Sequence, residues 1–183
     1  HTEVRAQLTN FKGHTDVIWG VAFGPDGQTF ASASWDQTVK LWDVRRRRIS
    51  EVLAPALGYS LSFSADSSLM ACSSGGRVSV WDVGQNKRVL DSPLQGVGDI
   101  TVALSPDGRT LAAAGDSRLI YLFDVETGAL RHSLPGHKSK IWSLAFAPDG
   151  LTVASASEDT TIILWEVATG RKRALLVGHT TVV

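Results

Sequence analysis

Residues 13–43 read GHTDVIWGVAFGPDGQTFASASWDQTVKLWD, and residues 136–166 read GHKSKIWSLAFAPDGLTVASASEDTTIILWE. Both stretches contain a Gly-His pair, a Pro-Asp-Gly turn and a closing Trp followed by an acid. The His-to-Trp spacing is 28 residues in each, and the offset between the stretches is 123 residues. Weaker copies lie between them, so that Trp42, Trp81, Phe123 and Trp165 follow one another at 39, 42 and 42 residues. A period of about 40 residues is typical of stacked β-sheet units.

The composition excludes several classes of protein. The 183 residues carry 18 basic and 18 acidic side chains, so no net field favours nucleic acid or an anionic membrane. The single cysteine, Cys72, cannot form an internal disulfide or, alone, a structural zinc site, and it is compatible with a reducing cytoplasm, where we expect the protein. No apolar run approaches the length of a membrane span. Because the chain begins with His1 and not with Met, we expect further residues before it.

Each copy of the repeat predicts four strands. In the first copy these are Val17–Phe23, Thr29–Ser34, Thr38–Val44 and Glu51–Leu53, which are short, apolar or alternating, and bounded by turn residues. Pro25-Asp26-Gly27 supplies the first turn, because proline presets φ and glycine tolerates a positive φ. A single four-stranded sheet with two apolar faces cannot bury both of them alone, so neighbouring copies must stack.

With these elements the chain resembles a WD40-repeat β-propeller. The Gly-His, Pro-Asp-Gly, Ser-x-x-x-Asp and Trp-Asp elements cover almost its whole length. The resemblance implies an all-β fold, with four consecutive four-stranded antiparallel blades in an incomplete ring. It divides the single partial propeller of residues 1–183 into an orphan last strand (1–12), blade 1 (13–53), blade 2 (54–94), blade 3 (95–135), blade 4 (136–177) and the start of a fifth repeat (178–183).

Such rings usually need about seven blades, within a general range of roughly four to eight. We therefore expect either a fragment of a longer, bacterial-type WD40 protein or a piece that associates with itself to complete a ring. Exposed blade edges and apolar faces are otherwise sites of aggregation.

The resemblance also implies a buried hydrogen-bonded set that joins the histidine of Gly-His to a serine, an aspartate and a tryptophan. The matching residues are His14, Ser32, Asp36 and Trp42 in repeat 1, and His137, Ser155, Asp159 and Trp165 in repeat 4. Buried imidazole and indole N–H groups are costly unless each finds an acceptor. We therefore assign these residues to the structure and not to catalysis or metal binding.

Repeats 2 and 3 depart from this pattern. Cys72 stands at the serine position of repeat 2, and Ala113, Ser117 and Phe123 stand at the serine, aspartate and tryptophan positions of repeat 3. We expect that losing the polar members together leaves no group unpaired, and that these blades keep the fold with less rigid turns.

Aromatic residues mark a candidate binding face. By resemblance, Trp19, Tyr59, Ile100 and Trp142 approach the central channel near the top face, which carries the turns between second and third strands and the connections between blades. Trp35 lies on the same face. Two interpretations stay open, anchors for a partner or inner packing residues, and we expect the polar neighbours Lys140, Asp116 and Glu158 beside them.

The run Arg45, Arg46, Arg47 and Arg48 follows the third strand of repeat 1, on the opposite face. It is either an anion contact, for an acidic peptide, a phosphate or a nucleic-acid backbone, or a solvated loop. Its counterparts in repeats 3 and 4 are ordinary tight turns without a shared basic surface.

We therefore expect a non-catalytic scaffold that binds a protein or peptide at the top face, without cofactor, metal, membrane or nucleic acid. No HExxH, GxSxG, P-loop or CxxC motif is present. Two alternatives stay open. One is a regulatory or oligomerising propeller arm of a larger kinase, NTPase or protease fusion, and the other is polyanion binding through the arginine run.

Overall fold

The computed structural model describes residues 10–53, 60–94, 98 and 100–181, and these residues form strands and turns without a helix. Sixteen strands make four antiparallel sheets, each ordered as in the sequence. Blade 1 is β1 (Ile18–Phe23), β2 (Thr29–Ser34), β3 (Val39–Asp43) and β4 (Arg48–Leu53); blade 2 is β5 (Leu61–Phe63), β6 (Leu69–Ser74), β7 (Arg77–Asp82) and β8 (Lys87–Pro93). Blade 3 is β9 (Thr101–Leu104), β10 (Thr110–Ala114), β11 (Leu119–Asp124) and β12 (Leu130–Pro135); blade 4 is β13 (Ile141–Phe146), β14 (Thr152–Ser157), β15 (Thr161–Glu166) and β16 (Lys172–Val177).

The turn between the first two strands is built in the same way in every blade. The carboxylate of an aspartate accepts a hydrogen bond from the amide two residues later, at 2.9 to 3.0 Å. The four aspartates are Asp26, Asp66, Asp107 and Asp149. This local bond favours the tight turn and so fixes where each hairpin reverses.

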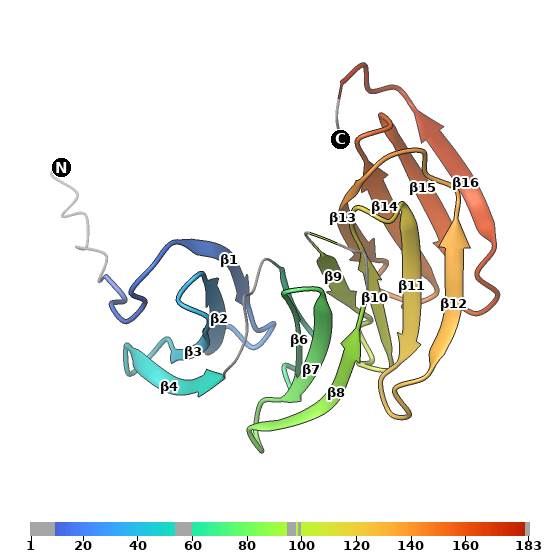
Figure 1. The fold of residues 1–183 in the computed structure, drawn as a ribbon. Helices are drawn as coiled ribbons and strands as arrows, with labels where there is room; N and C mark the ends of the chain where they lie inside the picture. Colours follow the sequence, from blue (N-terminus) through green and yellow to red (C-terminus); the bar gives the residue numbers. More distant parts are fainter. Residues whose placement is uncertain (1–9, 54–59, 95–97, 99, 182–183) are drawn as a thin grey trace, which may run out of the picture.

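The blades stand side by side along an open arc (Figure 1). Their innermost strands follow one another, β1 against β5, β5 against β9 and β9 against β13. A separate hydrophobic core fills each junction between neighbouring blades, with Leu41 and Met70 in the first, Val80 and Leu111 in the second, and Leu122 and Trp165 in the third. The chain is therefore held together by blade-to-blade burial, as expected for stacked repeats.

These observations confirm the predicted fold class, four four-stranded antiparallel blades without a closed ring in the described part of the chain. The last strand of blade 1 begins at Arg48, three residues before the predicted Glu51. The predicted orphan strand in 1–12 lies largely outside the described residues, and residues 178–181 form no strand. Among the described residues, none forms a helix long and apolar enough to cross a membrane.

Candidate functional site

The polar residues that recur in repeat 1 lie within hydrogen-bond distance of one another. His14 Nδ1 lies 2.7 Å from Asp36 Oδ2, and His14 Nε2 lies 2.6 Å from Ser32 Oγ. The same Ser32 oxygen accepts the indole N–H of Trp42 at 2.7 Å. Since a carboxylate only accepts, Nδ1 of His14 carries a hydrogen, and in the neutral imidazole Nε2 accepts the Ser32 hydroxyl.

Repeat 4 has the same arrangement. His137 Nδ1 lies 2.9 Å from Asp159 Oδ2, His137 Nε2 lies 2.8 Å from Ser155 Oγ, and Trp165 donates to Ser155 at 2.8 Å. Within each set, the side chains satisfy one another's hydrogen-bonding groups. These bonds link the segment that enters the blade to its second and third strands.

The aspartates are held in their ionised form. Burial by itself raises the pKa of Asp36, but hydrogen bonds from Thr38, His14 and the Thr15 amide outweigh it, and the pKa lies well below its ordinary value. The pKa of Asp159 is lowered in the same way, against burial, by Thr161 and by the Lys138 amide. A carboxylate surrounded by donors stabilises its turn and is a poor general base near neutral pH.

Blade 2 contradicts the expectation that its polar groups disappear together. Trp81 keeps its indole N–H, and among the described residues this nitrogen is the buried side-chain atom that lacks a hydrogen-bond partner. Cys72 pairs with Ser79 across the strands, as Ser32 pairs with Lys40, so it takes the serine position. Its sulfur is only a weak acceptor for the nearby indole N–H, and burial, which outweighs this contact with Trp81, raises the pKa of its thiol to about 12. In blade 3 the expectation holds at the tryptophan position, because the phenyl ring of Phe123 has no N–H.

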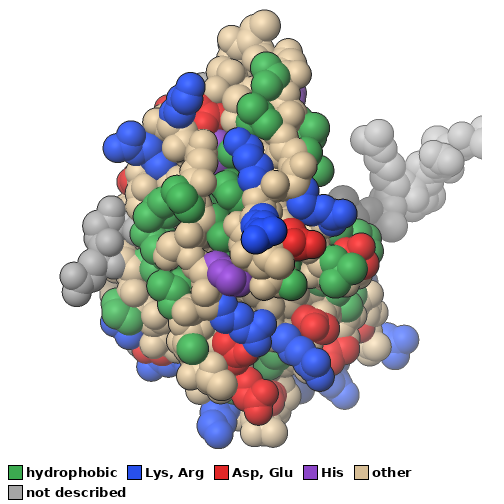
Figure 2. All heavy atoms as spheres, turned by 90° about the vertical axis from the view of Figure 1, so that its right-hand side faces the viewer, with side chains coloured by type: hydrophobic (Ala, Val, Ile, Leu, Met, Phe, Trp, Pro, Cys, Tyr) green, Lys and Arg blue, Asp and Glu red, His purple; other side chains and the backbone are tan. Residues whose placement is uncertain are grey.

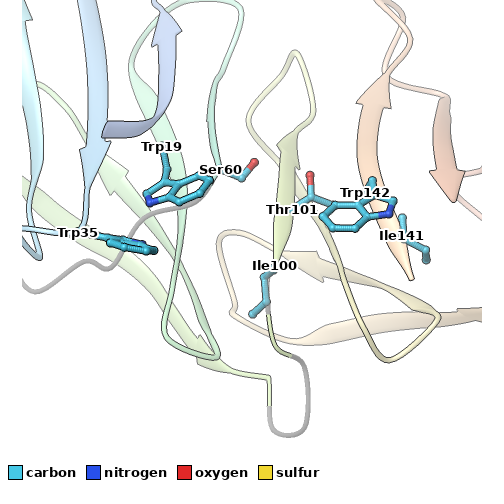
Figure 3. Close-up of a pocket in the computed structure, with 7 residues that line it drawn as sticks. All are labelled: Trp19, Trp35, Ser60, Ile100, Thr101, Ile141 and Trp142. Carbon is cyan, nitrogen blue, oxygen red and sulfur yellow. The ribbon is translucent and has the colours of Figure 1, made fainter. Parts of the chain in front are cut away.

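Four of the aromatic and apolar residues predicted for the top face line one cavity of about 400 Å³. The full lining is Trp19, Trp35, Ser60, Ile100, Thr101, Ile141 and Trp142. Figure 3 shows Trp19 and Trp35 on one side of this cavity and Trp142 on the other, with Ile100 and Thr101 between them. The indoles of Trp19 and Trp35 lie 5.2 Å apart and are tilted by 42°. Blades 1, 2, 3 and 4 therefore all contribute to one apolar hollow.

The three tryptophans in this cavity are open to solvent. Trp19, Trp35 and Trp142 are 52%, 44% and 47% exposed, whereas Ile100 is buried and belongs to the wall. In the described part of the chain, no residue covers the solvent-facing side of the Trp19 and Trp142 indoles. Tyr59, which we predicted beside them, lies outside the described residues.

At each of the two inner-strand tryptophans, a β-bulge sets the direction of the side chain. The register between β1 and β2 shifts between Ile18 and Gly20, and Trp19 is the extra residue. Blade 4 has the same shift around Trp142. A bulge turns one side chain out of the regular alternation of a strand, and here it directs the indole to the cavity. The bulges were not predicted from the sequence, although Ile-Trp followed by a small residue recurs in both copies.

Charged groups border the Trp142 wall. Lys140 Nζ lies 3.0 Å from Asp116 Oδ1 and 4.0 Å from the centre of the Trp142 ring, so blades 3 and 4 are bridged above the cavity. Glu158 accepts the Ser139 hydroxyl at 2.7 Å. Of the polar residues predicted for this face, Lys140 lies over the Trp142 ring, and none of the three is among the residues that line the cavity.

The arginine run lies at the opposite end of blade 1, between β3 and β4. Arg46 contacts Asp43 through its guanidinium at 3.0 Å and its amide at 2.7 Å, and Arg48 is the first residue of β4. Arg47 has a φ of 55°, where blades 3 and 4 have a glycine in the corresponding turn. Arg46 and Arg47 therefore help to form the turn between β3 and β4.

Residues 5–43, 58–82, 84–124 and 128–166, most of the chain, match the family described as WD domain, G-beta repeat. The chain is 30% identical to Target of rapamycin complex subunit wat1 of Schizosaccharomyces pombe over 127 residues, 67% of this chain and 40% of that protein. It is 33% identical to WD repeat-containing protein SL1-17 of Schistosoma mansoni over 141 residues, 75% of this chain and 46% of that protein. With mouse striatin the identity is 31% over 153 residues, 73% of this chain and 19% of that protein. The chain thus spans less than half the length of these curated relatives.

Proposed function

The chain belongs to the WD40-repeat family, and from that premise we propose that it is a non-catalytic scaffold that binds a protein or peptide at its top face. The observation that carries the proposal is the cavity of about 400 Å³ to which blades 1 and 4 contribute three half-exposed tryptophans. An apolar hollow that presents indoles to water gains free energy when a partner side chain fills it.

The shape and chemistry of the cavity support a side chain as its occupant. Apolar walls formed by Trp19, Trp35, Ile141 and Trp142 surround a few hydroxyl groups, and a volume of this size fits a small group of apolar atoms. Anchors of this kind are enriched in tryptophan because one indole buries a large area for little conformational entropy. The partner therefore presents an aliphatic or aromatic side chain to the cavity.

A scaffold role also agrees with how the polar residues are used. The histidines and aspartates of repeats 1 and 4 bind one another and leave no free acid–base pair in those networks. One relative, wat1, is by its name a subunit of a protein complex. We propose the same general role for this chain, as a component that holds other proteins.

The test is a peptide selection followed by titration. Random dodecapeptides displayed on phage are selected on the immobilised chain, and a selected peptide is titrated by fluorescence anisotropy. Trp35→Ala is expected to weaken binding by about 1 kcal/mol or more, which is roughly fivefold or more in Kd. Trp142→Ala, on the other wall of the cavity, is expected to have the same effect.

Leu151→Ala is the matched control, because Leu151 is an exposed apolar residue in the turn between β13 and β14, at the opposite end of the sheet. It is expected to leave the Kd unchanged. Peptides that bind Trp35→Ala and Trp142→Ala as tightly as the unmodified chain would remove the cavity from the binding site.

The length of this chain, compared with that of its curated relatives, favours a second candidate function. Since the chain spans less than half of its curated relatives, it also fits a propeller arm within a larger protein. A parent sequence that joins these repeats to a kinase, NTPase or protease domain would support this candidate.

A further inference from the structure

Among the described residues, none covers one apolar face of blade 4. Its other face packs on blade 3 through Leu144, Val153, Ile163 and Trp165. Strand residues alternate between the two faces, so the alternate set points away from blade 3. This set is Ala145, Ala154, Ala156, Ile162, Leu164 and Leu176, which we name the blade 4 free face. None of the six is buried, and Leu176 is 48% exposed. Figure 2, seen from the side of Figure 1 on which β12 and β16 lie, shows hydrophobic side chains at the surface between charged ones.

The same six side chains occur in blade 3, each 42 residues earlier. They are Ala103, Ala112, Ala114, Ile120, Leu122 and Leu134. In blade 3 all six are buried, because blade 4 packs on them. The blade 4 free face therefore repeats, residue for residue, a surface that binds a blade within this chain.

The complementary surface is found at the other end of the chain. The residues of blade 4 that fill the blade 3 surface include Leu144, Phe146, Val153 and Trp165, and their counterparts 123 residues earlier are Val21, Phe23, Phe30 and Trp42. We name this set the blade 1 free face. Val21 and Phe23 are 69% and 66% exposed. Lys40 stands where blade 4 has an isoleucine, but its Nζ donates to Thr38 Oγ1 at 2.8 Å and remains paired.

We propose that the blade 4 free face binds the blade 1 free face of a second copy of this chain. The contact is heterologous, since the two surfaces differ, and such contacts form rings when the rotation closes. Two copies supply two such contacts and eight blades, within the roughly four to eight blades of known propellers. The contact continues the packing that already joins the blades of one copy.

One segment has to move for this contact. Phe11 packs on Phe30 and Trp42, with ring centres 5.0 and 5.6 Å apart. Leu134, which packs on blade 4, lies 123 residues after Phe11. Phe11 therefore occupies on blade 1 the position that Leu134 occupies on blade 4. In the assembly this place belongs to Leu176 of the second copy. Phe11 therefore competes with docking, and Phe11→Ala is expected to shift the equilibrium towards two-chain particles; a shift towards single chains would contradict the proposed contact.

Light scattering over a concentration series tests the proposal. The chain is expected to approach twice its mass of 19.6 kDa as the concentration rises. Val21→Glu and Leu176→Glu each place a charge on one free face, and each variant alone is expected to stay single. Leu151→Glu, exposed but outside both faces, is expected to associate like the unmodified chain.

Mixing the two variants gives the sharpest outcome. A mixture of Val21→Glu and Leu176→Glu retains one contact in which both faces are unmodified, so a two-chain species is expected to return. Its return also shows that both variants are folded. Association that survives Val21→Glu but not Leu176→Glu would mean that blade 4 pairs with itself and would overturn the proposal. A single chain at every concentration would also overturn it, and would leave the face to further repeats of a longer polypeptide.

Discussion

Removing the hydroxyl of Ser155 tests whether the buried network of blade 4 stabilises the fold. Ser155 accepts the Trp165 indole N–H at 2.8 Å and lies 2.8 Å from His137 Nε2, and both partners are buried. Ser155→Ala leaves the two groups without a partner where water cannot replace the hydroxyl. Each of the two stranded buried groups costs about 1–3 kcal/mol, so we expect a loss of about 2–6 kcal/mol in the free energy of unfolding.

The assay is urea unfolding followed by tryptophan fluorescence, with amide exchange in β14 and β15 to locate the loss in blade 4. Ser133→Ala is the matched control, since Ser133 is an exposed serine of β12, and its effect is expected within about 0.5 kcal/mol. Trp165→Phe removes the N–H, so Ser155→Ala in that background is expected to cost about 1 kcal/mol less. A Ser155→Ala variant as stable as the Ser133→Ala control would refute the reasoning.

Three further predictions concern the other blades and the response to acid. Cys72→Ser is expected to raise the free energy of unfolding by about 1 kcal/mol, because a hydroxyl accepts the Trp81 N–H better than a thiol does; an unchanged urea midpoint would contradict this. Arg47→Gly is expected to raise the free energy of unfolding by about 0.5–1 kcal/mol, which thermal unfolding checks. Glycine adopts the φ of 55° without strain, and this gain exceeds the larger entropy that glycine loses on folding. The lowered pKa of Asp159 contributes stability above its ordinary value of 3.8, and this contribution disappears as the pH falls below about 4. Asp159→Asn is therefore expected to be clearly less stable than the unmodified chain at pH 6, with a difference that narrows steadily as the pH falls from about 4 to about 2, and a constant difference over this range would count against the carboxylate.

The strands and blades could be predicted because their causes are local. An aspartate turn and an alternating apolar run act within ten residues, and the repeat brings them back about every 40 residues. The exception is Trp81. The sequence shows that Cys72 replaces serine, but only the packing around the indole shows that no other acceptor reaches its N–H.

The candidate site could be predicted only in part. The pattern identified Trp19, Trp35 and Trp142 as candidates but left inner packing open for Trp19 and Trp142. The register shifts at Trp19 and Trp142 decide where these side chains point, and a bulge depends on how two strands pair, which one strand alone does not show. Ile100 was predicted beside them as a binding residue and is a buried part of the wall.

By itself, the sequence determined the repeat and the four-stranded blades, because each depends on residues within a single repeat, and the resemblance to WD40 repeats implied the partners of His14 and His137. Only the tertiary structure decided that Trp19 and Trp142, 123 residues apart, border one cavity, and that no described residue covers the blade 4 free face. Both depend on the rotation from one blade to the next, which accumulates along the arc and is set by packing between blades. No single repeat contains that information.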